Sequence, residues 1–224
     1  MVHIQRNRNE KNSNNWSRGF GREVLSLIEA INRLEEQYAF SGFIDDGIAS
    51  GEMINGFPVL GGIDYLSKQN EEINVAVAIG NPLTKKSIIE KLIKNKFILF
   101  PNIIHPLVFL NNYGNKFGVG NIICEGNIIT TNVQFGNFII LNLACTVGHD
   151  TVIEDFCSIM PGVNISGEVN LKKSVYIGTG AKIINQLEIG ENTIVGAGAV
   201  VYKSLPPNCT AVGLPAKPIK FHEK

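Results

Sequence analysis

The feature that most constrains this chain is a six-residue period that runs through its second half. Every sixth residue from Phe117 to Val201 is Ile, Leu, Val or Phe, without a break over fifteen positions. The residue two places before each of these is small or apolar from Val133 to Ala199. A hexapeptide repeat of this kind is typical of a parallel β-helix, in which each hexad supplies one short strand and one tight corner. The sequence therefore predicts a long β-helical prism.

An ordinary β-sandwich is the alternative, but it would show a period of two and hairpin turns rather than one phase held over fifteen hexads. In a β-helix the sixth residues point inward and stack on one another. Cys145 and Cys157 share the small inward phase, so we expect them to be buried, unreactive fillers rather than nucleophiles. Glycine often follows the sixth residue, as at Gly118 and Gly148, and we expect it to relieve a corner that needs a positive φ.

The first half of the chain shows a different pattern, in which helix and strand signals alternate. A helix is predicted over 22–34 and another over 83–95, with strands over 38–46, 73–81 and 96–100 and a turn-rich connection over 55–62. Such alternation predicts a small parallel α/β sheet. Ligands in these sheets bind at the carboxyl ends of the strands, where this sequence carries Asp45, Asp46 and Gly80.

The composition excludes several functional classes. Lys plus Arg and Asp plus Glu number 20 each, and a zero net charge argues against a general nucleic-acid binder. No apolar run is long enough to cross a bilayer, and no apolar stretch follows the N-terminal charges as in a secretory signal. The four cysteines are far apart in the sequence. We therefore expect a reduced, cytoplasmic protein without membrane insertion.

Several motifs resemble one family. "VGHDTVIEDFCSIMPGVNISGEV", "IGTGAKI", "IGENTIVGAGAVV" and "VGLPAK" are similar to hexapeptide-repeat acyltransferases, and "GFGREVLSLIE", "GFIDD", "NGFPVLGG" and "VAIGNP" resemble the sugar O-acyltransferases. That family contains sialic acid O-acetyltransferase and the nucleotide-sugar N-acetyltransferases of the bacillosamine and perosamine type. The resemblance covers residues 19–219. It implies an α/β N-terminal Rossmann-like domain over 19–100 that binds the acceptor, followed by a left-handed parallel β-helix acetyltransferase domain over 101–224, in a homotrimer.

The catalytic prediction centres on His149, which lies two residues past Val147 and should project outward from a corner. Such a corner can be merely solvated, but Asp150 follows directly and Gly167 lies one coil above. The resemblance implies that His149 is the general base, that Asp150 supports it and that the Gly167 N–H binds the oxyanion. We expect direct attack without an acyl-enzyme. For His105, in the first coil, a structural role is expected.

The resemblance also implies two sets of binding residues. Acetyl-CoA, the acyl donor, is expected in a groove between neighbouring prisms. Thr179 and Ala197 share the corner phase of His149 in the hexad count. The contacts with acetyl-CoA map to Ser158, Thr179 and Ala197. The contacts with a nucleotide sugar map to Arg18, Gly19, Phe20, Asp45, Asp46 and Gly80. Asp45 and Asp46 could instead be a solvated strand end.

The segment before "GFGREV" departs from the family. Relatives begin with an apolar strand similar to "KIVIIGAGGFGREV", whereas this chain reads "KNSNNWSRGFGREV". Removing one adenine from a coding sequence for residues 11–18 yields the apolar version, and one inserted base restores the frame. We hypothesise that residues 1–18 are an aberrant product of paired frameshifts; the alternative is a natural divergent or disordered tail. A polar central strand cannot bury its two faces, so the first strand would be lost and the acceptor site damaged.

The leading functional hypothesis is an acetyl-CoA-dependent acetyltransferase that acts on an amino group of a nucleotide-linked sugar in surface glycan biosynthesis. The close alternative is O-acetylation of a sugar such as sialic acid, because the same base serves both. A β-helical zinc carbonic anhydrase is rejected, since three histidines would have to converge on one metal and only His149 lies within the repeat; no metal is expected. A non-catalytic scaffold and a catalytically impaired nucleotide-sugar-binding protein remain as further alternatives.

Overall fold

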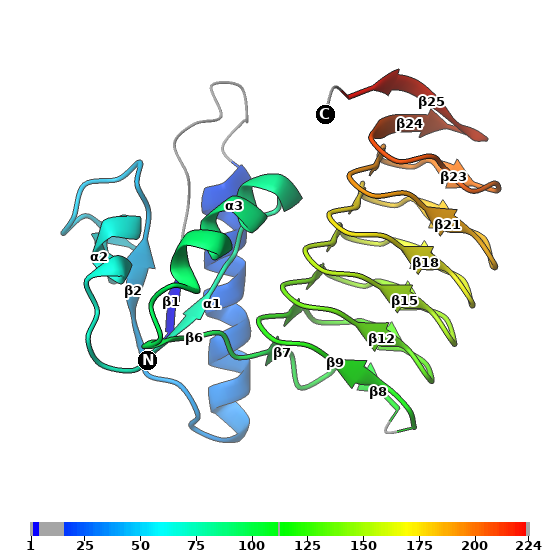
Figure 1. Cartoon of the computed structure of the whole chain (residues 1–224). Coiled ribbons are helices and arrows are strands. Elements are labelled where there is room, and N and C mark those ends of the chain that lie inside the picture. Colours follow the sequence, from blue (N-terminus) through cyan, green and yellow to red (C-terminus); the bar gives the residue numbers. More distant parts are fainter. Residues whose placement is uncertain (1, 5–15, 112, 223–224) are drawn as a thin grey trace. The chain divides into compact units, whose positions relative to one another are not determined.

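The computed structural model describes residues 2–4, 16–111 and 113–222, which form two compact units. The first unit contains the described residues up to Gly80 together with Thr84–Ile103, and the second contains Asn81–Leu83 and the chain from Ile104 onward. The first unit is α/β and the second is a left-handed parallel β-helix, as predicted (Figure 1). In the described part of the chain, no helix has both the length and the apolar character needed to span a bilayer.

The first unit is built on one six-stranded sheet with the order β3-β4-β2-β1-β5-β6. All neighbouring strands are parallel except β3 and β4, which form an antiparallel pair. The strands are β1 Val2–Ile4, β2 Phe40–Ile44, β3 Met53–Ile54, β4 Phe57–Gly61, β5 Ile73–Ala76 and β6 Ile98–Leu99, and the helices are α1 Trp16–Leu34, α2 Ile63–Ser67 and α3 Pro82–Leu92.

Helix α1 ends at Leu34, as predicted, but differs from the prediction at its start and in the burial of its last residue. It begins at Trp16 rather than Arg22, so the glycines of "GFG" lie inside the helix and not in a turn before it. The apolar stripe is buried as its 3.6-residue spacing predicts, whereas Leu34, expected on the same stripe, is 76% exposed at the last position. The buried residues of the stripe are Val24, Leu25, Leu27, Ile28 and Ile31.

Two features of the sheet correct the sequence analysis. The first strand is present, because Val2–Ile4 forms β1 between β2 and β5 in the middle of the sheet, ahead of the polar run where its loss was expected. Residues 5–15, on which most of the frameshift hypothesis rests, lie outside the described residues, and that hypothesis stays a prediction. The connection predicted over 55–62 is in fact strand β4, which pairs with β2 because Val59 fills a buried position between turn residues.

The second unit confirms the hexapeptide reading in detail. Each of the fifteen predicted inward residues is the second residue of a two-residue strand, and the strands pair in parallel with those one coil of 18 residues away. The strands are β9 Lys116–Phe117, β10 Ile122–Ile123, β11 Ile128–Ile129, β12 Gln134–Phe135, β13 Ile140–Leu141, β14 Thr146–Val147, β15 Val152–Ile153, β16 Ser158–Ile159, β17 Asn164–Ile165, β18 Asn170–Leu171, β19 Tyr176–Ile177, β20 Lys182–Ile183, β21 Glu188–Ile189, β22 Ile194–Val195 and β23 Val200–Val201.

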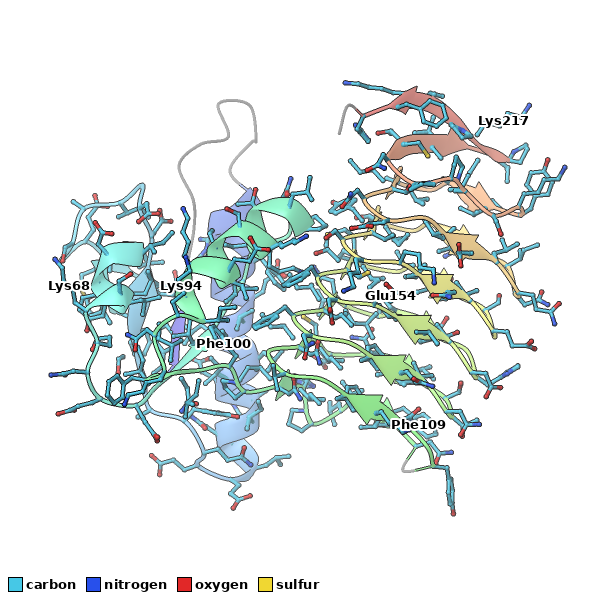
Figure 2. The ribbon with its side chains drawn as sticks, viewed as in Figure 1. Lys68, Lys94, Phe100, Phe109, Glu154 and Lys217 are labelled. Carbon is cyan, nitrogen blue, oxygen red and sulfur yellow. The ribbon has the colours of Figure 1, made fainter. Side chains whose placement is uncertain are left out.

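The repeat also begins earlier than the period of six could show. Strands β7 Ile103–Ile104 and β8 Phe109–Leu110 already pair with β10 and β11. The spacing from Leu110 to Phe117 is seven residues, so the six-residue period is interrupted there. The hexads before Phe117 were therefore not recognised from the sequence. The outward residue of β8, Phe109, is 61% exposed (Figure 2).

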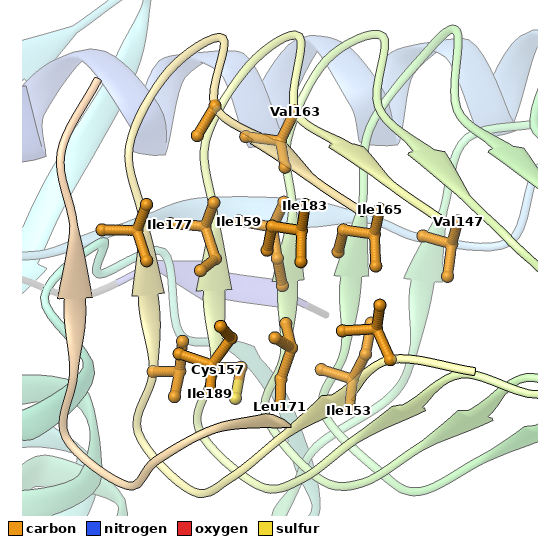
Figure 3. Packing of buried hydrophobic residues seen from close by; sticks show 14 of the residues in the cluster. Val147, Ile153, Cys157, Ile159, Val163, Ile165, Leu171, Ile177, Ile183 and Ile189 are labelled. Carbon is orange, nitrogen blue, oxygen red and sulfur yellow. The ribbon is translucent and has the colours of Figure 1, made fainter. Parts of the chain in front are cut away.

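The prism core is a column of inward side chains that stack between coils (Figure 3). Cys145 and Cys157 are fully buried in it, as predicted. Burial raises the pKa of the Cys145 thiol to about 11, and its Sγ donates to the Met160 carbonyl at 3.2 Å. The neutral thiol therefore behaves as a small filler that also satisfies a backbone acceptor.

Glycines occur at two positions of a corner, and the positive φ that was predicted is found at the second position only. The glycine directly after an inward residue does not have a positive φ; that conformation falls two residues later, as at Asp150 (57°) and Gly180 (72°). The first kind of glycine is required by close stacking, because a Cβ on Gly178 would lie 2.6 Å from the backbone N of Ala197 in the next coil. The prediction of a φ-relieving role for Gly118 and Gly148 is therefore wrong.

The early and the late coils of the prism differ in how they are held. In the early coils, the buried side chains of Asn121 and Asn127 accept hydrogen bonds from Ile139 N and Cys145 N, which lie 18 residues further on. At the other end, β24 Cys209–Gly213 extends the eight-stranded sheet in parallel, and β25 Ala216–Phe221 then pairs with β24 in the antiparallel direction.

Candidate active site

His149 occupies the corner that follows β14, and its side chain is 56% exposed. Val147 is held in the core, and the chain turns two residues later, so the ring is directed away from the prism. The predicted outward orientation is confirmed. A histidine on a rigid coil with an accessible ring is suited to exchanging protons with a bound molecule.

Asp150 is joined to His149 by a short hydrogen bond. Its Oδ2 lies 2.8 Å from His149 Nδ1, and its φ of 57° places the carboxylate beside the preceding ring. The hydrogen bond from His149, followed by one from Asn132, lowers the pKa of the Asp150 carboxyl. Because the ionised carboxylate accepts from Nδ1–H, the neutral ring leaves Nε2 free to accept a proton.

Gly167 lies under the imidazole, one coil further along the prism. A Cβ at this position would come within 2.5 Å of His149 Nε2, so the ring occupies space that only glycine leaves open. The coils are also joined here by the hydrogen bond from Glu168 N to His149 O at 2.8 Å. Among the described residues the Gly167 N–H has no hydrogen-bond partner. This glycine therefore sets the position of the ring and presents a free donor near it.

The predicted coenzyme residues lie elsewhere on the prism. Thr179 follows β19 and Ala197 follows β22, both in the eight-stranded sheet, whereas His149 follows β14 in a six-stranded sheet. Both residues are exposed, and they share one corner because they lie 18 residues apart. That corner is not the corner of His149. Each coil of 18 residues has three corners, so residues separated by a multiple of six need not lie on the same one. Ser158 is the first residue of β16, and its side chain is fully buried rather than on an open groove.

In the first unit, both predicted aspartates follow β2 and already hold backbone donors. Asp45 is buried and its Oδ1 accepts from Gly47 N at 2.7 Å. Asp46 Oδ1 accepts from Ile63 N at 2.8 Å, at the start of α2. Each carboxylate therefore shapes the strand end by holding a backbone N–H in place.

The remaining predicted acceptor contacts lie at two places in the first unit. Arg18, Gly19 and Phe20 lie within the first turns of α1. The N–H of Phe20 falls beyond the four N–H groups that a helix leaves unpaired at its start. It is therefore less available to bind a ligand than the N–H of a residue in a turn. Gly80 follows β5 and has open space at its Cα. Their predicted role in acceptor binding stays a prediction.

His105 has two local partners in the first coil. His105 Nδ1 accepts from Leu107 N at 3.2 Å, and its Nε2 lies 3.8 Å from Glu125 Oε2. His105 is buried, which fits the structural role expected for it. Within the described ranges, no three His, Cys, Asp or Glu side chains form a group that could hold a metal ion.

Asn132 is a site residue that the sequence analysis missed. Its Nδ2 donates to Asp150 Oδ1 at 3.0 Å. The available signal was its spacing: Asn132 lies 18 residues, and therefore one coil, before Asp150. A six-residue count does not separate the three corners of a coil and could not show this contact.

A left-handed hexapeptide prism that presents an exposed histidine–carboxylate pair beside a free backbone donor defines a hexapeptide-repeat acyltransferase. The comparisons narrow this class. The family model for the PglD N-terminal domain matches residues 17–92. The chain is 32% identical over 209 residues to GDP-perosamine N-acetyltransferase of Escherichia coli O157:H7, covering 90% of this chain and 92% of that protein.

Solved structures of acetyltransferases are also similar to this chain. A His-to-Asn mutant of perosamine N-acetyltransferase from Caulobacter crescentus, in complex with CoA and GDP-perosamine, matches with a TM-score of 0.83 at 25% identity, covering 98% of this chain and 96% of that one. The acetyltransferase domain of PglB from Neisseria gonorrhoeae FA1090, in complex with acetyl coenzyme A, matches with a TM-score of 0.85 at 29% identity, covering 97% and 98%. This chain belongs to the family of hexapeptide-repeat sugar acetyltransferases of the perosamine and bacillosamine type, and it is an acyltransferase.

Proposed function

We propose that this protein transfers the acetyl group of acetyl-CoA to the amino group of a nucleotide-linked amino sugar, with His149 as the general base. The observation that carries the proposal is the orientation of the imidazole. Nδ1 is bound to Asp150 at 2.8 Å, and Nε2 faces outward over Gly167. Relatives with a CoA or a GDP-sugar bound support the choice of both substrates.

The reaction follows from the chemistry of acyl transfer. The amine nitrogen attacks the thioester carbonyl while His149 Nε2 takes its proton, and Asp150 stabilises the imidazolium that forms. The tetrahedral intermediate then collapses with cleavage of the C–S bond, and the imidazolium returns the proton to the departing thiolate. An N–H that binds the oxyanion contributes roughly 3 kcal/mol in comparable sites, and the Gly167 N–H, on the residue against which the ring lies, is the donor proposed for this role.

The positions of the predicted coenzyme residues favour a site shared between copies of this chain. Thr179 and Ala197 lie on a different corner of the prism from His149, so a coenzyme bound along them would need the His149 corner of a second copy beside it. Threefold assembly closes such a head-to-tail contact into a ring. We therefore propose a homotrimer with acetyl-CoA between neighbouring prisms.

The first unit is proposed to bind the nucleotide part of the acceptor at the ends of its strands, near Asp45, Asp46 and Gly80. Two relatives that match nearly the full chain are perosamine N-acetyltransferases by name, which favours N-acetylation over O-acetylation of a sugar such as sialic acid. Biosynthesis of a surface glycan is the role that such a product suggests.

The test is thiol release from acetyl-CoA by the purified chain, measured over a panel of GDP- and UDP-linked amino sugars and free sialic acid. We expect turnover with a nucleotide-linked amino sugar, and a loss in kcat of about 10²–10⁴-fold in His149→Ala, the usual contribution of a general base. His222→Ala serves as the control, because His222 lies near the C-terminus, where its Nε2 is 3.1 Å from Thr210 Oγ1. Unchanged transfer by His149→Ala would favour a non-catalytic scaffold role for the corner.

A further inference from the structure

The corner that carries the histidine–carboxylate pair has one more polar member on the coil before it. Asn132 donates from Nδ2 to Asp150 Oδ1 at 3.0 Å. Since Oδ1 is engaged by this amide, the other carboxylate oxygen, Oδ2, is the one that faces His149 Nδ1 at 2.8 Å. A free carboxylate on an exposed corner could rotate about its side-chain bonds, and the second hydrogen bond removes that freedom.

The orientation of the Asn132 amide is itself determined by its surroundings. Asn132 has a φ of 56°, in the left-handed region that asparagine tolerates well. Its Oδ1 lies over the Cα of Gly114, in space that any Cβ on that residue would fill. The carbonyl oxygen is thus directed toward the bare glycine, and the NH₂ group is left pointing at the carboxylate. A flipped amide would place oxygen against oxygen at Asp150.

The neighbouring groups on this corner do not replace Asn132. Glu168, one coil beyond Asp150, carries a carboxylate that accepts from Gln186 Nε2 at 3.2 Å. The titratable side chains adjacent to Asp150 on this corner are therefore His149 and Glu168, and in the described part of the chain no lysine or arginine forms an ion pair with Asp150. The ring and the Asn132 amide are the two side chains that hold this carboxylate.

We infer that Asn132 is a positioning residue for the acetyl transfer, which acts by holding the Asp150 carboxylate against His149 Nδ1. The inference rests on the proposed role of His149 as the base. Asn132 itself touches no reacting atom; it acts through Asp150, and its effect is to keep the Nδ1–H tautomer and the basicity of the ring.

The variant that tests this is Asn132→Gly, because glycine adopts the left-handed φ without strain while removing the amide. Asn192→Gly is the matched control: Asn192 has a φ of 57° and donates to Asn208 Oδ1 at 3.0 Å, on a different corner. We expect kcat to fall about tenfold in Asn132→Gly, the factor that corresponds to one hydrogen bond to a charged group, with little change in either KM. The acid limb of the kcat/KM profile should move to lower pH, and Asn192→Gly should change neither.

A second readout does not depend on activity. In protein labelled with ¹⁵N at histidine, the His149 ring should titrate at lower pH in Asn132→Gly and lose part of its Nδ1–H tautomer, whereas Asn192→Gly should match the parent. An unchanged titration midpoint and tautomer in Asn132→Gly would overturn the inference, even if kcat fell. If instead His149→Ala retained full transfer activity, the proposed function would fail, and a shifted His149 titration would still show that Asn132 positions the pair.

Discussion

At the scale of single residues, the candidate site depends on glycines, which leave space for neighbouring side chains, as much as on its polar residues. His149 and Asp150 could be found from the sequence because they adjoin a core residue whose phase is fixed. Gly167 was named from resemblance, and the structure adds the physical reason, which is that the ring rests on its Cα. Asn132 could not be found, because its role depends on which corner of the prism each hexad occupies.

Gly167→Ala should therefore damage catalysis without unfolding the prism. The new methyl group would lie 2.5 Å from the present position of His149 Nε2, so the exposed ring must swing outward. We expect kcat to fall by about 10²-fold, the scale of a misplacement of roughly 1 Å, while thermal unfolding changes little because the ring has room in solvent. Steady-state kinetics and calorimetry check the two parts. A parent-like kcat would show that the ring position does not matter.

Cys145 gives a prediction about pH. Its thiol pKa is raised from 9.0 to about 11 by burial, so the stability gained from burying the neutral thiol is complete below pH 9 and is lost as the pH rises toward 11. We expect the urea midpoint to fall over this window, and to fall less in Cys145→Ala, which is less stable at neutral pH but has no thiol to ionise. Rapid reaction of a thiol reagent with the native protein at pH 8 would contradict the buried position of the four cysteines.

At the scale of the element, each coil is limited by how closely it approaches the next. Gly178 and Gly180 lie two residues apart and are required for different reasons. Gly178 lies against the backbone of the next coil, whereas Gly180 has a φ of 72° with open space around it. Composition alone cannot distinguish them, because both are read as corner glycines.

The pair can be separated by substitution. Gly178→Ala should lower the free energy of unfolding by roughly 1–3 kcal/mol, since the coils must move apart to admit a methyl group. Gly180→Asn should cost less than about 1 kcal/mol, because asparagine tolerates the left-handed region and nothing crowds the site. Chemical denaturation of both variants measures the difference. Equal losses would mean that φ rather than stacking dominates at these corners.

Predictability differed between the two units for a physical reason. The six-residue period identified the inward residue of every strand from β9 to β23, because one position per strand must be large and apolar to fill the prism. The α/β unit has no such rigid period, so β4 was taken for a connection and α1 began earlier than expected. Strand β1 lay in a segment that the resemblance marked as aberrant. Resequencing the coding region for residues 11–18 tests the frameshift hypothesis directly.

At the scale of the whole molecule, the proposed site needs edges from two copies. The chain alone presents the His149 corner and the Thr179–Ala197 corner on different edges of one prism. In the proposed arrangement a single chain holds each half of the site but not the pair, and we expect the mass in solution to be three times the 24.5 kDa of one chain. Light scattering after size-exclusion chromatography measures it.

A mixed assembly tests the shared site more sharply. His149→Ala removes the base, and Thr179→Trp fills the exposed corner where acetyl-CoA is proposed to lie. Each variant alone should be nearly inactive, but co-expressed subunits should recover about a quarter of the activity, because random mixing in a cyclic assembly joins one intact edge of each kind in that share of interfaces. Activity that never recovers would place the complete site within one chain.

The antiparallel strand β25 has a consequence for how prisms meet end to end. A solenoid of parallel coils could accept further coils from another molecule at its last rung and grow into a filament. By reversing direction across β24, β25 offers an edge whose hydrogen-bonding pattern no longer matches a parallel newcomer. The last rung of the eight-stranded sheet is therefore covered by a strand that a parallel coil from another molecule would not match.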